Sequence, residues 1–199
     1  IWVLIVKLGR MLRIPPVGYD QPMPGSDGLM FVDMLDMYNG AFDRYVWKLT
    51  GKRELYVPYN AYRLGQRKGE ALPLRGTQLD PALTRYELHR VWVIEATERG
   101  GTKHSFGKRT FYVDEDSWTV VLVENEDRQG RPWRLQEGHL VPLYDVQAVL
   151  AMPVMIYDLK DGRTLLTSLP PARGPALQAG TPLREADFMP ANVKIRYSR

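Results

Sequence analysis

The feature that most constrains the fold is a series of extended segments separated by short polar turns in the middle of the chain. Residues 85–97 (RYELHRVWVIEAT), 103–113 (KHSFGKRTFYV) and 118–124 (WTVVLVE) are rich in β-branched and aromatic residues, which favours strands. Gly, Asp and Asn gather between these segments, as they do in hairpin turns. Strands at this spacing, with no helical period between them, are typical of an antiparallel meander. We therefore predict a mainly β protein.

The segment 85–97 also predicts which of its faces is covered. One alternation carries mostly apolar side chains, whereas the other carries two glutamates and a histidine. Because successive side chains of a strand point to opposite faces, we expect the more apolar set to face a core. That set comprises Tyr86, Leu88, Arg90, Trp92, Ile94 and Ala96.

Two acidic clusters, Asp114–Asp116 and Glu124–Asp127, flank the apolar segment 118–124. They could form a metal or catalytic site, or they could be the ends of a hairpin. A calcium loop needs oxygen ligands at its first, third and fifth positions, and the fifth position counted from Asp114 is Trp118. We interpret the acids as turn residues, which hydrogen-bond to the local backbone.

Shorter elements are expected on both sides of the meander. Residues 2–6 suit a buried strand with 10–14 as its neighbour, and residues 29–38 and 185–197 suit short helices. Pro153, inside the apolar stretch 148–159, predicts a bulge or an edge position. An irregular connection is expected over residues 170–182. We expect residues 1–199 to form a single domain.

Composition excludes several classes of function. The 199 residues are 44% hydrophobic and 25% charged, as in ordinary globular proteins. The net charge of +4 is spread along the chain, which favours a solvated surface over nucleic-acid binding. No cysteine is present, so disulfides, thiolate metal sites and cysteine nucleophiles are excluded. The start, IWVLIVKLGR, is apolar and then basic, the reverse of a secretory signal. We expect a mature product or a part of a longer chain.

Catalytic motifs give little support to an enzyme. Gly25-Ser26-Asp27-Gly28 has the wrong spacing for a nucleophile elbow, so Ser26 is interpreted as a turn residue. No glycine-rich phosphate loop follows a strand. The three histidines, His89, His104 and His139, are isolated in the sequence. They are either structural groups or, if neighbouring strands bring them together, a zinc site.

The five tryptophans all fall in or beside predicted strands. Large rings at such positions can form a solid core. They can also line an apolar hollow in a curved sheet, which is where hydrophobic ligands bind. The residue pattern leaves both interpretations open.

Several blocks, taken in order, resemble one bacterial family. The blocks are GYDQPMPGSDGL, MYNGAFDRYVWKLTGKRELYVPYNAYRL, TRYELHRVWVIEAT, KRTFYVDEDSW and GRPWR. They are similar to the domain of unknown function 1329 family, which resembles outer-membrane lipoprotein-sorting proteins with the LolA/LolB-like fold. The resemblance runs from about Gly18 to the C-terminus, and residues 1–17 match less well.

The resemblance implies a strongly curved, incomplete antiparallel β-barrel with a few short helices that plug an apolar hollow. It also implies an export signal, a location in the periplasm or at the outer membrane of a Gram-negative bacterium, and a lipid or other hydrophobic ligand. Family members are thought to work beside resistance-nodulation-division-type exporters. They are commonly longer at the N-terminus, so this chain resembles their C-terminal portion. A sheet shortened in this way would expose an edge strand, and we expect self-association.

We therefore expect a non-enzymatic carrier for a lipid or other hydrophobic ligand, accessory to an export system, without catalytic residues, metal or cofactor. The residues expected to form its apolar wall are Tyr86, Leu88, Trp92, Phe111, Trp118 and Trp133. One alternative is an interaction module that docks on an exporter or an outer-membrane partner without holding cargo. A hydrolase or metal enzyme that uses the histidines is the other.

Overall fold

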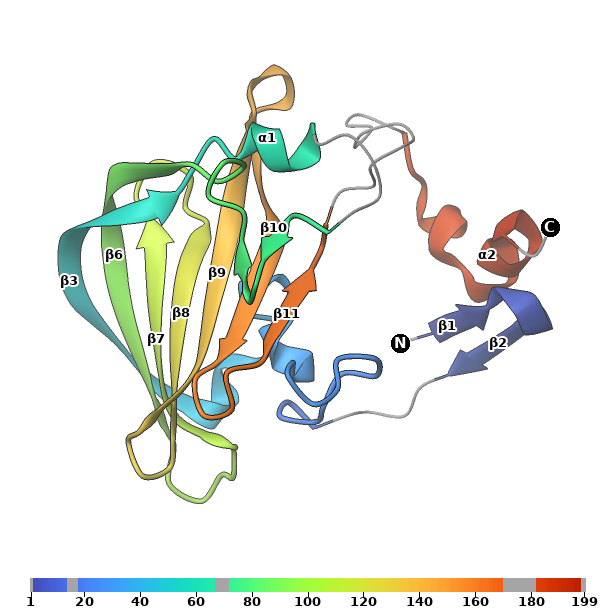
Figure 1. The fold of residues 1–199 in the computed structure, drawn as a ribbon. Helices are drawn as coiled ribbons and strands as arrows, with labels where there is room; N and C mark the ends of the chain where they lie inside the picture. The colour runs from blue at the N-terminus through green and yellow to red at the C-terminus, as the bar shows by residue number, and fades with distance from the viewer. Residues whose placement is uncertain (1, 14–17, 67–71, 170–181, 198–199) are drawn as a thin grey trace. The chain divides into compact units, whose positions relative to one another are not determined.

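A computed structural model describes residues 2–13, 18–66, 72–169 and 182–197 (Figure 1). It contains two compact units, one formed by residues 1–18 and 177–199 and the other by residues 19–176. Each unit is described by itself. Residues 170–181 of the expected irregular connection lie outside the described residues. The single domain over residues 1–199 stays a prediction.

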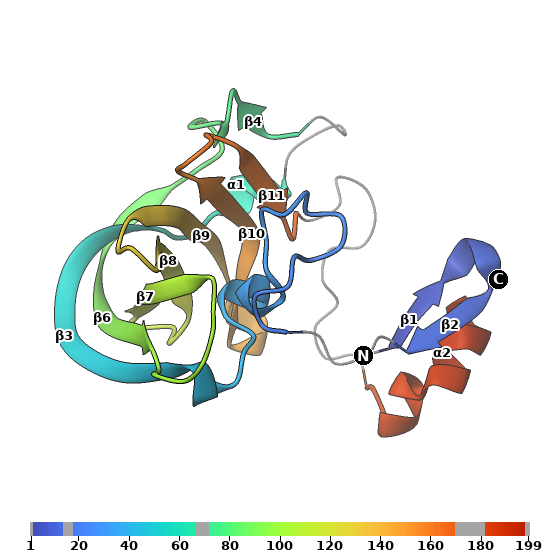
Figure 2. The same ribbon diagram turned by 90° about the horizontal axis from the view of Figure 1, so that it is seen from below.

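The larger unit is built on one antiparallel sheet of seven strands in the order β11-β10-β9-β8-β7-β6-β3. The strands are β3 (Tyr45–Pro58), β6 (Tyr86–Glu98), β7 (Phe106–Asp114), β8 (Val120–Asp127), β9 (Pro132–Leu143), β10 (Ala148–Asp158) and β11 (Thr164–Thr167). Strand β3 pairs with β6 and also approaches β8 and β9, because the sheet curves strongly (Figure 2). Among the described residues β3 and β11 do not pair, so the sheet is not closed. The predicted curved, incomplete antiparallel barrel with few short helices is confirmed.

The first acidic cluster lies at the turn between β7 and β8, and the second forms the end of β8, where Asp127 begins the turn to β9. The backbone N–H and hydroxyl of Ser117 donate to Asp114 Oδ2, at 2.8 and 2.6 Å. In the second turn, Asp127 Oδ1 accepts from the backbone N–H groups of Gln129 and Arg131 at 2.9 and 3.0 Å. The turn interpretation is confirmed for the first cluster and for Asp127. It is wrong for Glu124, Asn125 and Glu126, which lie in β8 and pair with β9. Pro153 lies at a bulge, since the register of β10 against β9 shifts between Ala151 and Val154.

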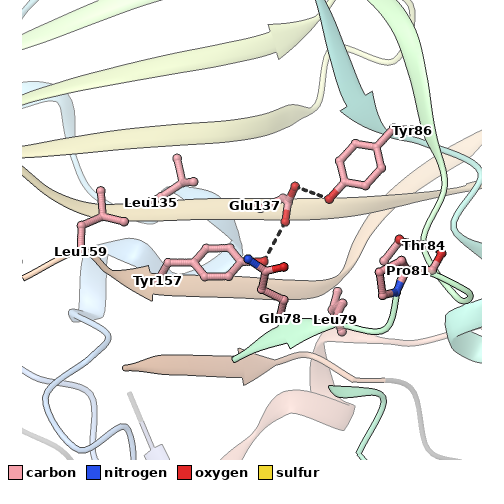
Figure 3. Close-up of a pocket in the computed structure, with 9 residues that line it drawn as sticks. All are labelled: Gln78, Leu79, Pro81, Thr84, Tyr86, Leu135, Glu137, Tyr157 and Leu159. Carbon is pink, nitrogen blue, oxygen red and sulfur yellow. Dashed lines mark hydrogen bonds between the residues drawn. The ribbon is translucent and has the colours of Figure 1, made fainter. Parts of the chain in front are cut away.

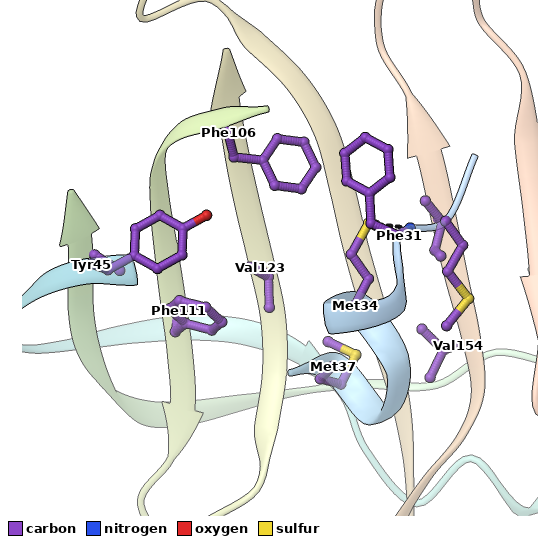
Figure 4. Close-up of a cluster of buried hydrophobic side chains, with 11 residues drawn as sticks. Phe31, Met34, Met37, Tyr45, Phe106, Phe111, Val123 and Val154 are labelled. Carbon is purple, nitrogen blue, oxygen red and sulfur yellow. Dashed lines mark hydrogen bonds between the residues drawn. The ribbon is translucent and has the colours of Figure 1, made fainter. Parts of the chain in front are cut away.

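One face of the sheet packs against the short 3-10 segment η2 (Val32–Met37), which confirms the helix expected at residues 29–38 (Figure 4). Phe31, Met34 and Met37 are buried there. The sheet side of this core comprises Tyr45, Ala96, Phe106, Phe111, Val123, Val154 and Ile156. Gly138 permits the close approach, because a Cβ at that position would lie 3.2 Å from Met37 Sδ.

A buried polar network fixes η2 to the same face. Arg109, with no exposed surface, donates to Asp33 Oδ2 at 2.6 Å. His104 Nε2 lies 3.1 Å from the same oxygen. The Gln136 amide donates to the carbonyls of Met34 and Met37, at 3.1 and 3.3 Å. The two bonds from Gln136 satisfy backbone carbonyls of η2, which is too short to satisfy all of its own backbone groups.

The opposite face is covered as well, by α1 (Tyr62–Gly65) and by the hairpin of β4 (Leu74–Arg75) and β5 (Gln78–Leu79). Leu64 and Leu79 pack there against Met155. The expectation of one covered face in residues 85–97 is therefore wrong. Val91 and Val93 of the less apolar alternation are buried, whereas Tyr86 and Leu88 are exposed. A sheet with cover on both faces does not follow a single period-two pattern.

The smaller unit holds β1 (Trp2–Ile5), η1 (Val6–Leu8), β2 (Arg10–Arg13), η5 (Glu185–Phe188) and α2 (Pro190–Tyr197). Strands β1 and β2 form an antiparallel hairpin, and η5 with α2 confirms a helical C-terminal segment. The expected burial of residues 2–6 is wrong, since Trp2 is 52% exposed. Two further 3-10 segments, η3 (Phe42–Arg44) and η4 (Tyr144–Val146), lie in the larger unit.

Candidate ligand-binding site

The face that carries η2 continues past the covered core into an open apolar cavity of about 490 Å³. We call this cavity the tryptophan hollow. The strand register places its side chains on one face, because Leu49 pairs with Ile94 and Trp92 pairs with Val113. Its lining consists of Trp47, Leu49, Trp92, Ile94, Val113 and Trp118. The hollow is therefore the part of the core face that η2 leaves uncovered.

The rings of the hollow lie in two places, one against the core and one near solvent. Trp47 packs against the buried Phe111, with ring centroids 5.4 Å apart. Trp92 and Trp118 stack at 6.3 Å with an interplanar angle of 27°. Trp118 is 71% exposed and Leu49 is 59% exposed. Exposed apolar surface of this kind makes the hollow a candidate binding site.

Two polar groups stand at this wall. The indole Nε1 of Trp92 is buried and has no hydrogen-bond partner among the described residues. Lys52 Nζ lies 3.9 Å from the centroid of the Trp92 ring. A buried donor without a partner is costly, so the wall of the hollow holds an unsatisfied N–H, and a positive charge lies against the Trp92 ring.

Trp118 is held in an unusual backbone conformation. Its φ is +56°, which is an outlier for a bulky residue. Its backbone N–H donates to the Asp114 carbonyl at 2.9 Å, and the buried Asp114 carboxylate contacts His89 Nδ1 at 2.7 Å. Asp114 thus has a structural role, since it fixes the turn that presents Trp118.

A charged group of side chains lies beside this turn. Glu115 accepts from Lys52 at 2.5 Å and from Arg90. Hydrogen bonds from Arg90 and Lys52 hold the pKa of Glu115 below its ordinary value. The positive charge of Lys52 near Trp92 is therefore shared with a carboxylate.

The structure brings together two of the six residues expected to form the apolar wall, Trp92 and Trp118. Phe111 is buried in the covered core, and Trp133 packs beside it against Phe31 while its Nε1 donates to Asp158 at 3.1 Å. The remaining two, Tyr86 and Leu88, lie at two other cavities.

Four residues of the hollow were not singled out as ligand contacts from the sequence: Trp47, Leu49, Ile94 and Val113. Trp47 belongs to the aromatic set noted there. The aliphatic residues give no local signal, because only long-range strand pairing places them beside the tryptophans.

The three histidines lie in three different polar settings. His104 contacts Asp33, His139 lies 3.4 Å from Glu137, and His89 contacts Asp114. Among the described residues one group could hold a metal ion, namely His89, Asp114 and Asp116. Asp114 already accepts hydrogen bonds from Ser117, which accounts for that cluster structurally. No described helix is long and apolar enough to cross a membrane.

Comparison with known proteins identifies the family. The match to the family described as protein of unknown function (DUF1329) spans residues 1–194. The chain belongs to this family. The match includes residues 1–17, where the resemblance of the sequence blocks is weaker. An uncharacterized protein of Pseudomonas aeruginosa is 39% identical over 194 residues, which are 97% of this chain and 43% of that protein. The chain thus spans less than half the length of this relative.

Two solved structures have a fold similar to that of this chain. One is a Vibrio parahaemolyticus domain named provisionally as an outer membrane lipoprotein-sorting protein domain, with a TM-score of 0.58 and 17% identity over 97% of this chain and 65% of that chain. The other is a DUF1329 family protein from Desulfovibrio piger, with a TM-score of 0.50 and 13% identity over 94% of this chain and 61% of that chain. At these identities the likeness establishes the fold.

Proposed function

We propose that this DUF1329 chain belongs to a non-enzymatic binding or carrier protein that holds a lipid or other hydrophobic ligand in the tryptophan hollow. The observation that carries the proposal is the apolar cavity of about 490 Å³ that continues the core face of an unclosed sheet. Cavities of this size, lined mainly by apolar and aromatic groups with a few polar ones, are typical of small-molecule sites.

The chemistry of the hollow indicates the kind of ligand. Each Å² of apolar surface removed from water contributes roughly 25 cal/mol, and the three tryptophans offer large rings for an acyl chain. Trp92 Nε1 and Lys52 supply a hydrogen-bond donor and a cation. A carbonyl, carboxylate or phosphate oxygen on the ligand would satisfy the buried donor. The ligand we propose is therefore an amphiphile with an acyl chain and an acceptor head group.

We place the protein in the periplasm or at the periplasmic face of the outer membrane, accessory to an exporter. The fold likeness to a Vibrio domain named for lipoprotein sorting supports this location. A resistance-nodulation-division-type exporter or an outer-membrane protein is the proposed partner, since a carrier needs a source and an acceptor for its cargo.

The second candidate is a docking module without cargo. It is favoured by the openness of the hollow, since Trp118 and Leu49 are exposed enough to insert into a partner protein. An exposed apolar patch is as typical of protein interfaces as of ligand sites. Cargo binding by the isolated protein distinguishes the two functions.

The test is a titration with a fluorescent fatty acid, monitored by the emission of the probe and by quenching of tryptophan. We expect saturable binding at near-equal stoichiometry to the wild type. Trp118→Ser removes an exposed ring without opening the core, and we expect it to lower affinity at least about tenfold, the equivalent of the 1–2 kcal/mol lost with part of an aromatic contact. Tyr144→Ser is the matched control, because Tyr144 is equally exposed, at 72%, and does not line the hollow.

Two outcomes would contradict the carrier function. The first combines two negative results: native mass spectrometry finds no lipid on the protein purified from a Gram-negative host, and the fluorescent fatty acid does not bind. Together these results would favour the docking module. The other is that Trp118→Ser and Tyr144→Ser bind equally well. Trp92→Asp provides a further check: a folded variant without binding places Trp92 in the wall of the site.

A further inference from the structure

A second cavity, of about 470 Å³, lies over the other face of the sheet (Figure 3). We call it the Glu137 pocket. Gln136 is paired with Val123 on the face covered by η2. Because side chains alternate along a strand, the next residue, Glu137, points to the opposite face. The pocket is thus separate from the tryptophan hollow, and its walls include Leu135 and Leu159.

Glu137 is the charged group of this pocket. Its side chain is only 12% exposed. The Tyr86 hydroxyl donates to Glu137 Oε1 at 2.7 Å, and the Tyr157 hydroxyl donates to Oε2 at 3.1 Å. Figure 3 shows the carboxylate between these two phenols, which come from β6 and β10.

The carboxylate is held in its ionised form. Burial raises the pKa of Glu137, but the nearby imidazole of His139 and the hydrogen bonds from the two tyrosines outweigh burial and lower it. Burial, and next the negative charge of Glu137, raise the pKa of Tyr86 and of Tyr157. The phenols therefore remain donors, and the pocket carries a negative charge at neutral pH.

The basic group nearest to this carboxylate is a histidine. Among the described residues, no lysine or arginine forms an ion pair with Glu137, and the nearest basic group is His139 Nε2 at 3.4 Å. His139 is itself fully buried, and neither of its ring nitrogens makes a hydrogen bond to a described residue. Buried carboxylates are normally paired with a cation. Each carboxylate oxygen can also accept a further hydrogen bond.

We propose that the Glu137 pocket binds the protonated amine of an amphiphile, with the ammonium on Glu137 and the apolar part against Leu135 and Leu159. An ammonium supplies the full positive charge that no lysine or arginine among the described residues brings to Glu137, and up to three donors. The rings of Tyr86 and Tyr157, which line the same cavity, attract a cation through their faces. A metal ion is a poorer fit, because it needs several ligating groups, and the lining of the pocket includes a single carboxylate.

The experiment compares three ligands of equal chain length by isothermal titration calorimetry with the complete protein: decylammonium, decanol and decanoate. We expect decylammonium to bind at least about tenfold more tightly than decanol, since a charge-assisted hydrogen bond distinguishes the two. Lysophosphatidylethanolamine is the fourth probe. Its binding would identify a lipid head group as the source of the amine, whereas binding of decylammonium alone would indicate a free amine. If neither binds, the proposal is wrong.

Glu137→Gln keeps the shape of the side chain and removes the charge, so the preference for decylammonium over decanol should disappear. Tyr157→Phe keeps the ring and removes one hydroxyl, and we expect it to retain the preference with a smaller reduction in affinity. Leu159→Trp fills the rim of the pocket without touching the carboxylate, and it should block all four probes there. If Glu137→Gln did not fold, the ligand series with the wild type and with Leu159→Trp would still test whether the Glu137 pocket binds the amine.

Trp118→Ser separates this proposal from the carrier function. It should weaken fatty-acid binding in the tryptophan hollow and leave decylammonium binding unchanged. An ammonium preference that survives Glu137→Gln, or that is lost in Trp118→Ser, would overturn the assignment of the amine to the Glu137 pocket.

Discussion

The tryptophan hollow and the Glu137 pocket are nearly equal in volume, about 490 and 470 Å³, and they lie on opposite faces of one sheet. Their polar groups have opposite character. The hollow presents an unpartnered indole N–H and a lysine, whereas the pocket presents a carboxylate between two phenols. The size of a cavity therefore says little about its ligand. In our two proposals, one or two polar groups at the wall distinguish the head group that each cavity would take.

The two cavities also arise in different ways. The hollow exists because η2 covers only part of its face, so its boundary is set by the contacts that fix η2. The pocket has a different origin. Tyr86 lies in the first part of β6, before the residues that pair with β7. Its side chain therefore reaches Glu137 on β9. Each origin can be tested by changing the residues that create it.

The largest effect is expected where η2 is fixed to the sheet. Arg109→Met would leave Asp33 buried without its cation, at a site where both side chains are at most 1% exposed. Loss of one partner of a buried pair costs roughly 3–5 kcal/mol. We expect the free energy of unfolding, measured by urea titration, to fall by about that amount, and η2 to loosen over the hollow.

The control is the double variant Asp33→Leu/Arg109→Met, which removes both charges and should recover a large part of the lost stability. A single variant that loses less than about 1 kcal/mol would show that the pair does not fix η2. The contacts that fix η2 would then not explain where the hollow begins.

A smaller effect is expected at Trp118, whose backbone is held at φ +56°. Glycine adopts this conformation without penalty, whereas alanine does not. Trp118→Gly should therefore be about 1 kcal/mol more stable to urea than Trp118→Ala, although both lose the stacking on Trp92. Both variants should lose fatty-acid affinity. Equal stability of the two would mean that the positive φ at residue 118 stores no conformational strain in the turn.

The contrast between the cavities also explains what could be predicted from the sequence. Turns depend on neighbours in the chain, and Asp114 and Asp127 fulfil the expectation because their hydrogen bonds reach only two to four residues along it. The family blocks and the strand spacing were sufficient for the curved antiparallel sheet. Turn residues and strand spacing can be recognised without knowing which face of the sheet other segments cover.

The sites themselves depend on long-range packing. Phe111 and Trp92 are both aromatic residues of predicted strands, yet η2 covers one and leaves the other at the hollow. Glu137 was missed because its two phenol partners are 51 and 20 residues away in the sequence. Tyr86 was expected to contribute its ring to an apolar wall, and the structure adds its hydroxyl on Glu137.

The smallest expected effect concerns the charge of Glu137 and its dependence on pH. Tyr86, Tyr157 and His139 face this carboxylate, and its pKa in the folded protein is lower than the ordinary value of 4.5. A carboxyl group with a lowered folded pKa binds fewer protons when folded than when unfolded. Its contribution to stability is therefore complete above about pH 4.5 and is lost as the pH falls through the lower folded pKa.

We expect the difference in unfolding free energy between the wild type and Glu137→Gln, measured by urea titration at a series of pH values, to favour the wild type above about pH 4.5 and to shrink below it. Glu54→Gln is the control, because it removes an exposed carboxylate on β3, and its difference from the wild type should stay nearly constant. A Glu137→Gln difference that grew toward acid pH would show that the carboxyl group is protonated in the folded protein. The pocket would then be a neutral site, and the contrast with the tryptophan hollow would rest on shape alone.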